Sequence, residues 1–318
     1  MSEDREITVL TRPRGKPIPR LPDSVPLPIS SPTAALYTSL AKSTGHTPHR
    51  LRLTKGSDGS PLPNSSTTTL ASTGLRDRSV VHVKDLGPQI AWRTVFIVEY
   101  LGPLLIHPLL YSLRLSPASP FAPAGVRASE LQTASLALVC LHFLKREWET
   151  VAVHRFSAAT MPARNIVKNS GHYWLLSGLL VAFFTYSPSV SNPISAVAAP
   201  GASVWDPLPL AGIALFAVGE GLNLVTHLKL SNLRPAGTTT RGIPRGFPLF
   251  ETVTCPNYTF ELLAWLGMAL VNRSWTTVVF AVVAGATMGL WAQKKERRYR
   301  KEFKEYKRKR SVMIPFVF

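Results

Sequence analysis

The chain has 318 residues, a formal net charge of +18 and two cysteines, Cys140 and Cys255. So few cysteines exclude a disulfide framework and a zinc site of the cysteine type. The sequence also lacks an HExxH pair, a GxGxxG after a strand and a GxxxxGK[ST], so it predicts no metal site, no Rossmann domain and no P-loop.

Hydrophobic residues make up 45% of the chain, and they lie mainly after position 90. Residues 1–88 are rich in Pro, Ser, Thr and Arg, whereas residues 89–293 contain repeated apolar stretches near the length that crosses a bilayer. We therefore predict a small cytosolic domain at 1–88, a transmembrane bundle at 89–293 and a basic cytosolic segment at 294–318.

The N-terminal domain shows strand patterns at 7–10, 49–56 and 79–87 and an amphipathic helix at 33–45. This order resembles a ubiquitin-like β-grasp domain. The many prolines between 13 and 32 make a regular second strand unfavourable at that place. No charged-then-apolar signal peptide precedes the domain, so we expect it on the cytosolic side.

Six apolar segments follow, which predicts an α-helical membrane protein with about six transmembrane helices, at 91–113, 131–146, 172–187, 207–228, 252–271 and 274–292. The loops after the second and fourth segments are rich in Lys and Arg, whereas the loop after the third segment has none. Because Lys and Arg favour the cytosolic side, both termini are expected in the cytosol.

The run at 294–310 has eleven basic and three acidic residues and supplies +8 of the net charge. Anionic membrane lipid is one expected partner, since basic residues near a bilayer surface are attracted to its head groups. A phosphate-bearing ligand is the alternative. Nucleic acid is not expected, because the run adjoins a membrane helix and no reader fold accompanies it.

Two ionisable residues fall inside apolar segments near the same membrane surface. Glu99 lies seven residues past Trp92, about 10 Å along a helix, and Tyr258 follows a cytosolic loop at a comparable depth. A carboxylate at such depth is costly and should face a bundle interior or a wet cavity. A shared chamber for the two is therefore one hypothesis, and a protonated carboxyl bonded between helices is the other.

The fourth segment places Glu220, Asn223 and His227 on one helical stripe that leads toward Arg234. Such a stripe suits a nucleotide lying along the helix, with its phosphates at the basic end. Ordinary hydrogen bonding between membrane helices is the alternative for each residue.

Several motifs occur together in one order: "DLGPQIAWRTVFIVEYLGPLL", "VHRFSAATMPARNIVKNSGHYW", "LRPAG", "CPNYTFELLAWLG" and "RRYRKEFKEYKRKRSVMIPFVF". Over nearly the whole chain the sequence resembles the very-long-chain trans-2-enoyl-CoA reductase branch of the steroid 5α-reductase family. It departs from the family pattern in its Pro-rich insertion and in its "KRKRSVMIPF" ending, which concern surface and folding more than chemistry.

The resemblance implies NADPH-dependent reduction of trans-2-enoyl-CoA in the endoplasmic reticulum membrane, with other fatty-acid elongation enzymes as possible partners. It implies that Tyr258 is the proton donor, that Glu99 is the buried catalytic glutamate and that Asn223 contacts nicotinamide. Further cofactor-binding positions follow from the same resemblance: His227, Arg234, Lys145, Arg146, Tyr173, Arg298 and Tyr299.

These residue types suit the reaction, since a tyrosine stays protonated at neutral pH and can give a proton to an enolate. Glu99 is expected to orient that phenol or to relay a proton to it. Glu261, one turn after Tyr258, is expected to support the phenol or to pair with a basic residue of the loop. Three rival functions are a membrane methyltransferase, a 3-oxo-steroid reductase and a non-enzymatic adaptor.

Overall fold

A computed structural model describes residues 5–115, 128–156, 159–187, 202–233, 242–306 and 310–317. The chain divides into two compact units. The first unit comprises Met1–Trp92 with Ala158–Asn165, and the second comprises Arg93–Ser157 with Ile166–Phe318. Each unit has its own buried core and is described separately below.

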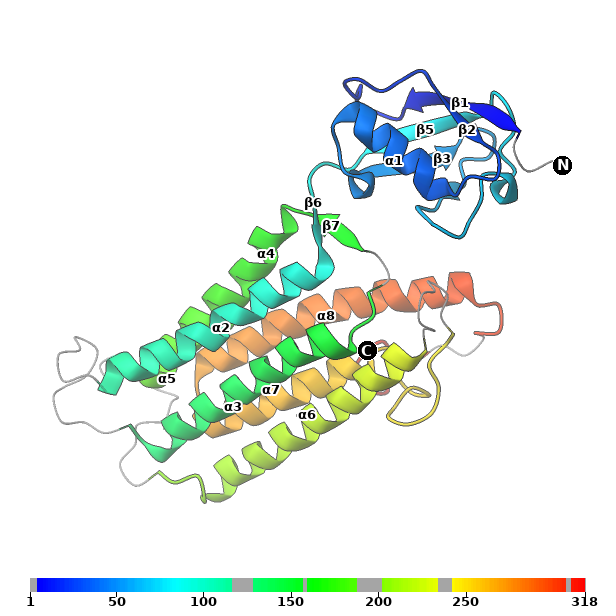
Figure 1. The fold of residues 1–318 in the computed structure, drawn as a ribbon. Coiled ribbons are helices and arrows are strands. Elements are labelled where there is room, and N and C mark those ends of the chain that lie inside the picture. The colour runs from blue at the N-terminus through cyan, green and yellow to red at the C-terminus, as the bar shows by residue number, and fades with distance from the viewer. Residues whose placement is uncertain are drawn as a thin grey trace. The chain divides into compact units, whose positions relative to one another are not determined.

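The first unit contains a five-stranded mixed sheet in the order β2-β1-β5-β3-β4. The central pair, β1 and β5, is parallel, and the other neighbours are antiparallel. The strands are β1 Glu6–Pro13, β2 Ser24–Pro28, β3 Leu51–Lys55, β4 Pro61–Leu62 and β5 Val80–Asp85. The helix α1, Thr33–Thr44, lies across this sheet (Figure 1).

The strand β2 corrects the expectation that the prolines prevent a second strand. It lies at the edge of the sheet, paired only with β1. The backbone amide of Thr11 donates to the carbonyl of Asp23, and that of Ile29 donates to the carbonyl of Arg5. The residue pairs that exchange hydrogen bonds between β1 and β2 are therefore the odd-numbered ones. Pro26 and Pro28 are even-numbered, so their backbone nitrogens point away from β1 toward the open edge of the sheet, where no hydrogen bond to a neighbouring strand is needed. Proline is therefore compatible with this strand.

The core of the first unit is apolar because alternate residues of the strands face α1. Val9, Leu36, Leu53, Val81 and Val83 are fully buried there. Burying each such side chain contributes about 1.5–3 kcal/mol relative to leaving it in water. The unit also contains the short sheet of β6 Gln89–Ala91 and β7 Thr160–Pro162, two segments far apart in the chain.

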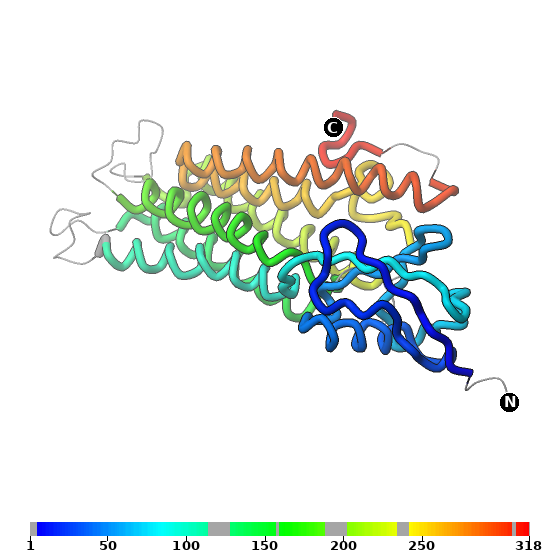
Figure 2. Tube along the Cα trace, turned by 90° about the horizontal axis from the view of Figure 1, so that it is seen from above, coloured from blue at the N-terminus to red at the C-terminus, as the bar shows by residue number. Residues whose placement is uncertain are grey.

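The second unit is a bundle of long helices that lie alongside one another in both views (Figures 1 and 2). Its elements are α2 Trp92–Leu115, α3 Glu130–Trp148, η3 Glu149–Val153, α4 Asn165–Gly171, η4 His172–Leu180, α5 Val181–Tyr186, α6 Pro207–Asn232, α7 Pro256–Asn272 and α8 Trp275–Glu302. The elements η3 and η4 are π-helical, so α4, η4 and α5 continue one another with a wider turn between them.

Three helical segments among the described residues are long and apolar enough to cross a membrane: Trp92–Leu113, Pro207–Asn232 and Trp275–Glu302. They coincide with the first, fourth and sixth segments predicted from the sequence. The helix α7 begins at Pro256, four residues later than predicted, and α8 runs ten residues past its predicted end, into the basic run. The chain is thus a mostly helical membrane protein.

Glycines bring α6 and α7 close together. An added Cβ on Gly267 would lie 2.5 Å from the Gly212 carbonyl oxygen, and one on Gly219 would lie 2.6 Å from the Ala264 nitrogen. Such small residues allow close backbone approach, which membrane helices use for packing. This approach places Asn223 of α6 against the first turns of α7.

Candidate active site

The second unit encloses a cavity of ≈ 610 Å³, within the size range of small-molecule sites. Its walls come from α2, α3, the segment after η3, α4, η4, α6, α7 and α8. Seven of the residues predicted from sequence line it: Glu99, Arg146, Tyr173, Asn223, His227, Tyr258 and Tyr299. The shared chamber predicted for Glu99 and Tyr258 is therefore present.

Tyr258 lies in the first turn of α7, two residues after Pro256. Proline is favourable at the first position of a helix, because the backbone N–H that it lacks would have no hydrogen-bond partner in the helix. Tyr258 packs against the buried cluster of Cys255, Met288, Ala292 and Met313. Its hydroxyl makes no hydrogen bond to any described residue. A phenol with an uncommitted proton therefore lies in the cavity wall.

Glu99 is 1% exposed, and its Oε2 has no hydrogen-bond partner among the described residues. Asn169, Tyr100 and Arg146 lie beside the carboxyl group. No hydrogen bond joins Glu99 to Tyr258 in the described ranges, so any action of Glu99 on the phenol passes through the contents of the cavity. A buried, partly unsatisfied carboxyl group in a cavity is typical of a functional site.

Asn223 is held at both ends of its carboxamide. Its Oδ1 accepts a hydrogen bond from Lys145 Nζ at 2.7 Å. Its Nδ2 donates to the Asn257 carbonyl at 2.9 Å and to Glu261 Oε2 at 3.1 Å. Lys145 is not among the residues that line the cavity, and its ammonium group bonds to Asn223 and Glu220 and lies 3.3 Å from Glu149 Oε1. Lys145 thus supports a wall residue from behind.

Glu261 pairs with His142 of α3, whose Nε2 lies 3.3 Å from its Oε1. Its partners are therefore His142 and Asn223, and neither the Tyr258 phenol nor a basic loop residue is among them in the described chain. The expectation of a supporting role survives, but the group supported is Asn223.

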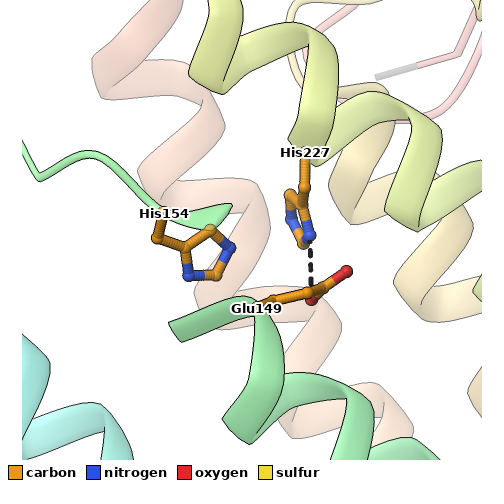
Figure 3. A group of neighbouring side chains, drawn as sticks. All are labelled: Glu149, His154 and His227. Carbon is orange, nitrogen blue, oxygen red and sulfur yellow. Dashed lines mark ion pairs between the residues drawn. The ribbon is translucent and has the colours of Figure 1, made fainter. Parts of the chain in front are cut away.

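Arg146 is bonded to three neighbours. It donates to Glu149 Oε2 at 2.6 Å and to the Tyr100 hydroxyl at 2.9 Å, and its NH1 lies 3.2 Å from His227 Nδ1. His227 in turn lies 3.1 Å from the Glu149 carboxylate (Figure 3). The guanidinium group thus ties α3 to α2 and α6 at the cavity wall.

Glu149, His154 and His227 present three atoms within 4.8 Å of one another, a spacing that a metal ion can use (Figure 3). The guanidinium group of Arg146 already occupies the carboxylate, and its positive charge opposes a bound cation. Burial and the neighbouring Arg146 lower the pKa of His154 to about 3. The donor set therefore fits an ion-pair network better than a metal site.

The end of α8 contributes Tyr299, 1% exposed, to the cavity wall. Arg298 points elsewhere, because it is exposed and paired with Glu302. Arg234 lies outside the described residues. Besides Arg146, the described Lys and Arg residues that line the cavity are Arg155, Lys168, Lys294 and Lys295.

The C-terminal segment braces the loop that precedes Tyr258. The backbone amide of Ser311 donates to the Thr252 carbonyl. In return, the amide of Thr254 donates to the Ser311 carbonyl, and the amide of Cys255 donates to the Val312 carbonyl. Glu296 of α8 accepts hydrogen bonds from Thr254 and from the Tyr306 hydroxyl at 2.6 Å. Burial and Glu296 raise the pKa of Tyr306 to about 12, so it remains a donor at neutral pH.

Sequence reasoning missed His142 and Glu149. The signal was present in "LHFLKREWE", where His142, Lys145, Arg146 and Glu149 recur at spacings of three and four on one helical face. The stretch was interpreted instead as the end of a membrane segment and a basic loop. Charged residues that continue a helix past its apolar part can mark a buried polar interior.

The chain matches the family model described as 3-oxo-5-alpha-steroid 4-dehydrogenase over residues 159–318. It belongs to this steroid 5α-reductase family. Within the family, a very-long-chain enoyl-CoA reductase of Dictyostelium discoideum is 40% identical over 84% of this chain and 86% of its own length. A Schizosaccharomyces pombe relative with an enoyl reductase name is 42% identical over 95% of this chain and 97% of its own.

A trans-2,3-enoyl-CoA reductase-like protein of Homo sapiens is 29% identical over 78% of this chain and 67% of its own length. These relatives confirm the branch of the family that the sequence motifs predicted.

Proposed function

We propose that this member of the steroid 5α-reductase family reduces the 2,3 double bond of trans-2-enoyl-CoA to give the saturated acyl-CoA, as the final step of very-long-chain fatty acid elongation. The single observation that carries this is the cavity that is lined both by the phenol of Tyr258 and by the buried carboxyl of Glu99. The enoyl-CoA reductase relatives support the choice of substrate.

The cavity fits a phosphate-bearing nicotinamide cofactor at its basic side. Arg155 and Lys168 line it from the loop after η3 and from α4, and Lys294 and Lys295 line it from α8. Arg and Lys form charge-assisted hydrogen bonds with phosphate groups. Because NADPH carries a 2′-phosphate that NADH lacks, these residues would bind NADPH more tightly than NADH. Asn223, His227, Arg146, Tyr173 and Tyr299 would hold the rest of the cofactor.

When bound, the cofactor supplies the hydride that reduces the β carbon of the thioester. Tyr258 then gives its proton to the α carbon, which requires a phenol that is protonated at neutral pH and bonded to nothing else. An unperturbed tyrosine has a pKa near 10, so the phenol is protonated at neutral pH. Its hydroxyl also has no hydrogen-bond partner among the described residues. Glu99 contributes a second exchangeable proton in the same chamber. The apolar walls at Phe280, Ala284 and Met288 suit an acyl chain.

We also propose the ubiquitin-like identity of the first unit, because its mixed sheet with β1 and β5 parallel at the centre and one helix across it has the β-grasp order. The proposed organisation is a cytosolic domain at 1–88, a bundle of six crossings at 89–293 and a basic segment at 294–318. The basic loops and tail support cytosolic termini. The enzyme would lie in the endoplasmic reticulum membrane, beside other elongation enzymes.

The test is an assay of purified full-length protein with trans-2-hexadecenoyl-CoA, following cofactor absorbance. We expect NADPH to be consumed only when the enoyl-CoA is present, and NADH to serve poorly. A 3-oxo-Δ4-steroid in place of the enoyl-CoA tests the function named in the family description. Turnover of the steroid without turnover of the enoyl-CoA would overturn the proposed substrate, and equal rates with NADH would remove the phosphate-binding role of the basic wall.

A further inference from the structure

A closed ring of four hydrogen bonds and one ion pair lies behind one wall of the cavity. His142 Nδ1 lies 2.6 Å from Glu220 Oε1, and its Nε2 lies 3.3 Å from Glu261 Oε1. Lys145 Nζ donates to Glu220 Oε2 at 2.8 Å and to Asn223 Oδ1 at 2.7 Å. Asn223 closes the ring by donating to Glu261 Oε2 at 3.1 Å. Three helices, α3, α6 and α7, meet in this ring.

Only two members of the ring, Asn223 and Glu261, line the cavity. His142 is 1% exposed and is enclosed by the rings of Phe143 and Trp265, whose centroids lie 4.8 and 5.1 Å from its own. His142 therefore has no access to a ligand. Any effect that it has on binding or reaction must pass through the residues that it bonds.

The geometry favours a charged His142. Each ring nitrogen faces a carboxylate oxygen, and only the imidazolium form can donate to both. With His142 charged, two positive groups of the ring, His142 and Lys145, match two negative ones, Glu220 and Glu261. Lys145 also lies 3.3 Å from Glu149, whose charge is matched by Arg146. Loss of one member would leave an uncompensated buried charge, which is strongly destabilising.

The ring fixes what Asn223 can offer to the cavity. Both hydrogens of its Nδ2 are used, one by the Asn257 carbonyl at 2.9 Å and one by Glu261. Its Oδ1 accepts one hydrogen bond from Lys145 and retains a second lone pair. In this arrangement Asn223 acts toward a ligand as an acceptor.

We propose that His142 is a positioning residue which, through Glu220 and Glu261, holds the Asn223 carboxamide as a hydrogen-bond acceptor for the bound cofactor. The inference rests on the proposed function. The chemical group that fits is the amide N–H of the nicotinamide carboxamide. A cofactor whose ring carries a group without an N–H loses this hydrogen bond.

The test measures cofactor binding to the full-length protein by titration without acyl substrate. NADPH is compared with its 3-acetylpyridine analogue, in which a methyl group replaces the amide nitrogen. The wild-type protein should bind NADPH more tightly than the analogue by about tenfold, the size of one hydrogen bond. In His142→Gln, Glu261 and Glu220 lose their charged partner and no longer fix Asn223 and Lys145 in place, so the ratio should fall toward one and the NADPH affinity should fall about tenfold or more.

The matched control is His107→Gln. His107 is also fully buried, between the Tyr186 hydroxyl and the Ser177 carbonyl, and does not line the cavity. This variant should keep the wild-type ratio. The double variant His142→Gln/Glu220→Gln removes one charge of each sign, so its NADPH affinity should exceed that of His142→Gln alone.

The outcomes separate the two proposals. A wild-type protein that binds neither cofactor contradicts the proposed function itself. A wild-type protein that binds both cofactors equally overturns the acceptor assignment of Asn223, whether or not any variant folds. An unchanged ratio in His142→Gln overturns the positioning role alone, and a double variant that binds more weakly than the single one overturns the charge-balance argument.

Discussion

The two units of the chain bury different chemistry. In the first unit the buried polar side chains among the described residues are threonines, such as Thr11 and Thr54, set in an aliphatic core. In the second unit the buried side chains include carboxylates, histidines and an arginine, among them Glu99, Glu149 and His142. Burying charge is costly and is retained where a reaction or a ligand requires it. We therefore expect variants of the second unit to have the largest effects on turnover.

The largest effect should come from Tyr258→Phe, which removes only the hydroxyl from the cavity wall. Loss of a positioned general acid typically lowers turnover about 10²- to 10⁴-fold. NADPH affinity should change little, because the ring remains and keeps its packing against the cluster that includes Cys255 and Met288. Steady-state kinetics and a cofactor titration measure the two quantities. Tyr111→Phe is the matched control, since Tyr111 bonds to Thr133 and does not line the cavity.

A core substitution in the first unit should lower stability and leave turnover almost unchanged. Leu53→Ala leaves a cavity in a fully buried position of its core and should lower the free energy of unfolding of that unit by about 2–5 kcal/mol. Hydrogen exchange of the β3 and β5 amides reports this loss. Turnover at a temperature where the unit stays folded should remain within about twofold of wild type. A collapse of turnover with the fold intact would show that the first unit takes part in the reaction.

A third variant, Glu99→Gln, tests whether Glu99 acts with the phenol. Turnover should fall about tenfold to a hundredfold, because the acidic proton of the Glu99 carboxyl group is lost while the proton of Tyr258 remains. Added to Tyr258→Phe it should cost little more, since groups that act as a unit are strongly non-additive. Independent full losses in the double variant would assign Glu99 and Tyr258 separate roles.

The smallest effect concerns the exposed surface of the first unit. Arg50 lowers the pKa of Asp85 to about 2, and the Gly87 amide contributes to the same shift. The pair therefore stabilises the fold above the unfolded pKa near 4, and this stabilisation is lost as the pH falls toward 2. Because Asp85 is 30% exposed, Asp85→Asn should cost only about 0.5 kcal/mol at pH 7. Hydrogen exchange should show no difference near pH 2.

The sequence predicted most of the helices and seven residues of the cavity wall because apolar length, basic loops and motif order are local signals. It missed β2, because the tolerance of Pro26 and Pro28 depends on an edge position that only the assembled sheet defines. It also assigned Lys145 to the cofactor, whereas the ammonium group supports Asn223. Which side chain faces the cavity and which stands behind it depends on how three helices pack, which residue spacing leaves open.

The most direct test of the central claim follows the hydrogen atoms. Purified protein is incubated in D₂O with NADPH and trans-2-hexadecenoyl-CoA, and the acyl product is analysed by mass spectrometry and NMR. A phenol that exchanges with solvent should place one deuterium on the α carbon, while the β carbon receives hydrogen from the cofactor. A saturated product without deuterium at the α carbon, or no product at all, would contradict proton delivery from Tyr258 in this cavity.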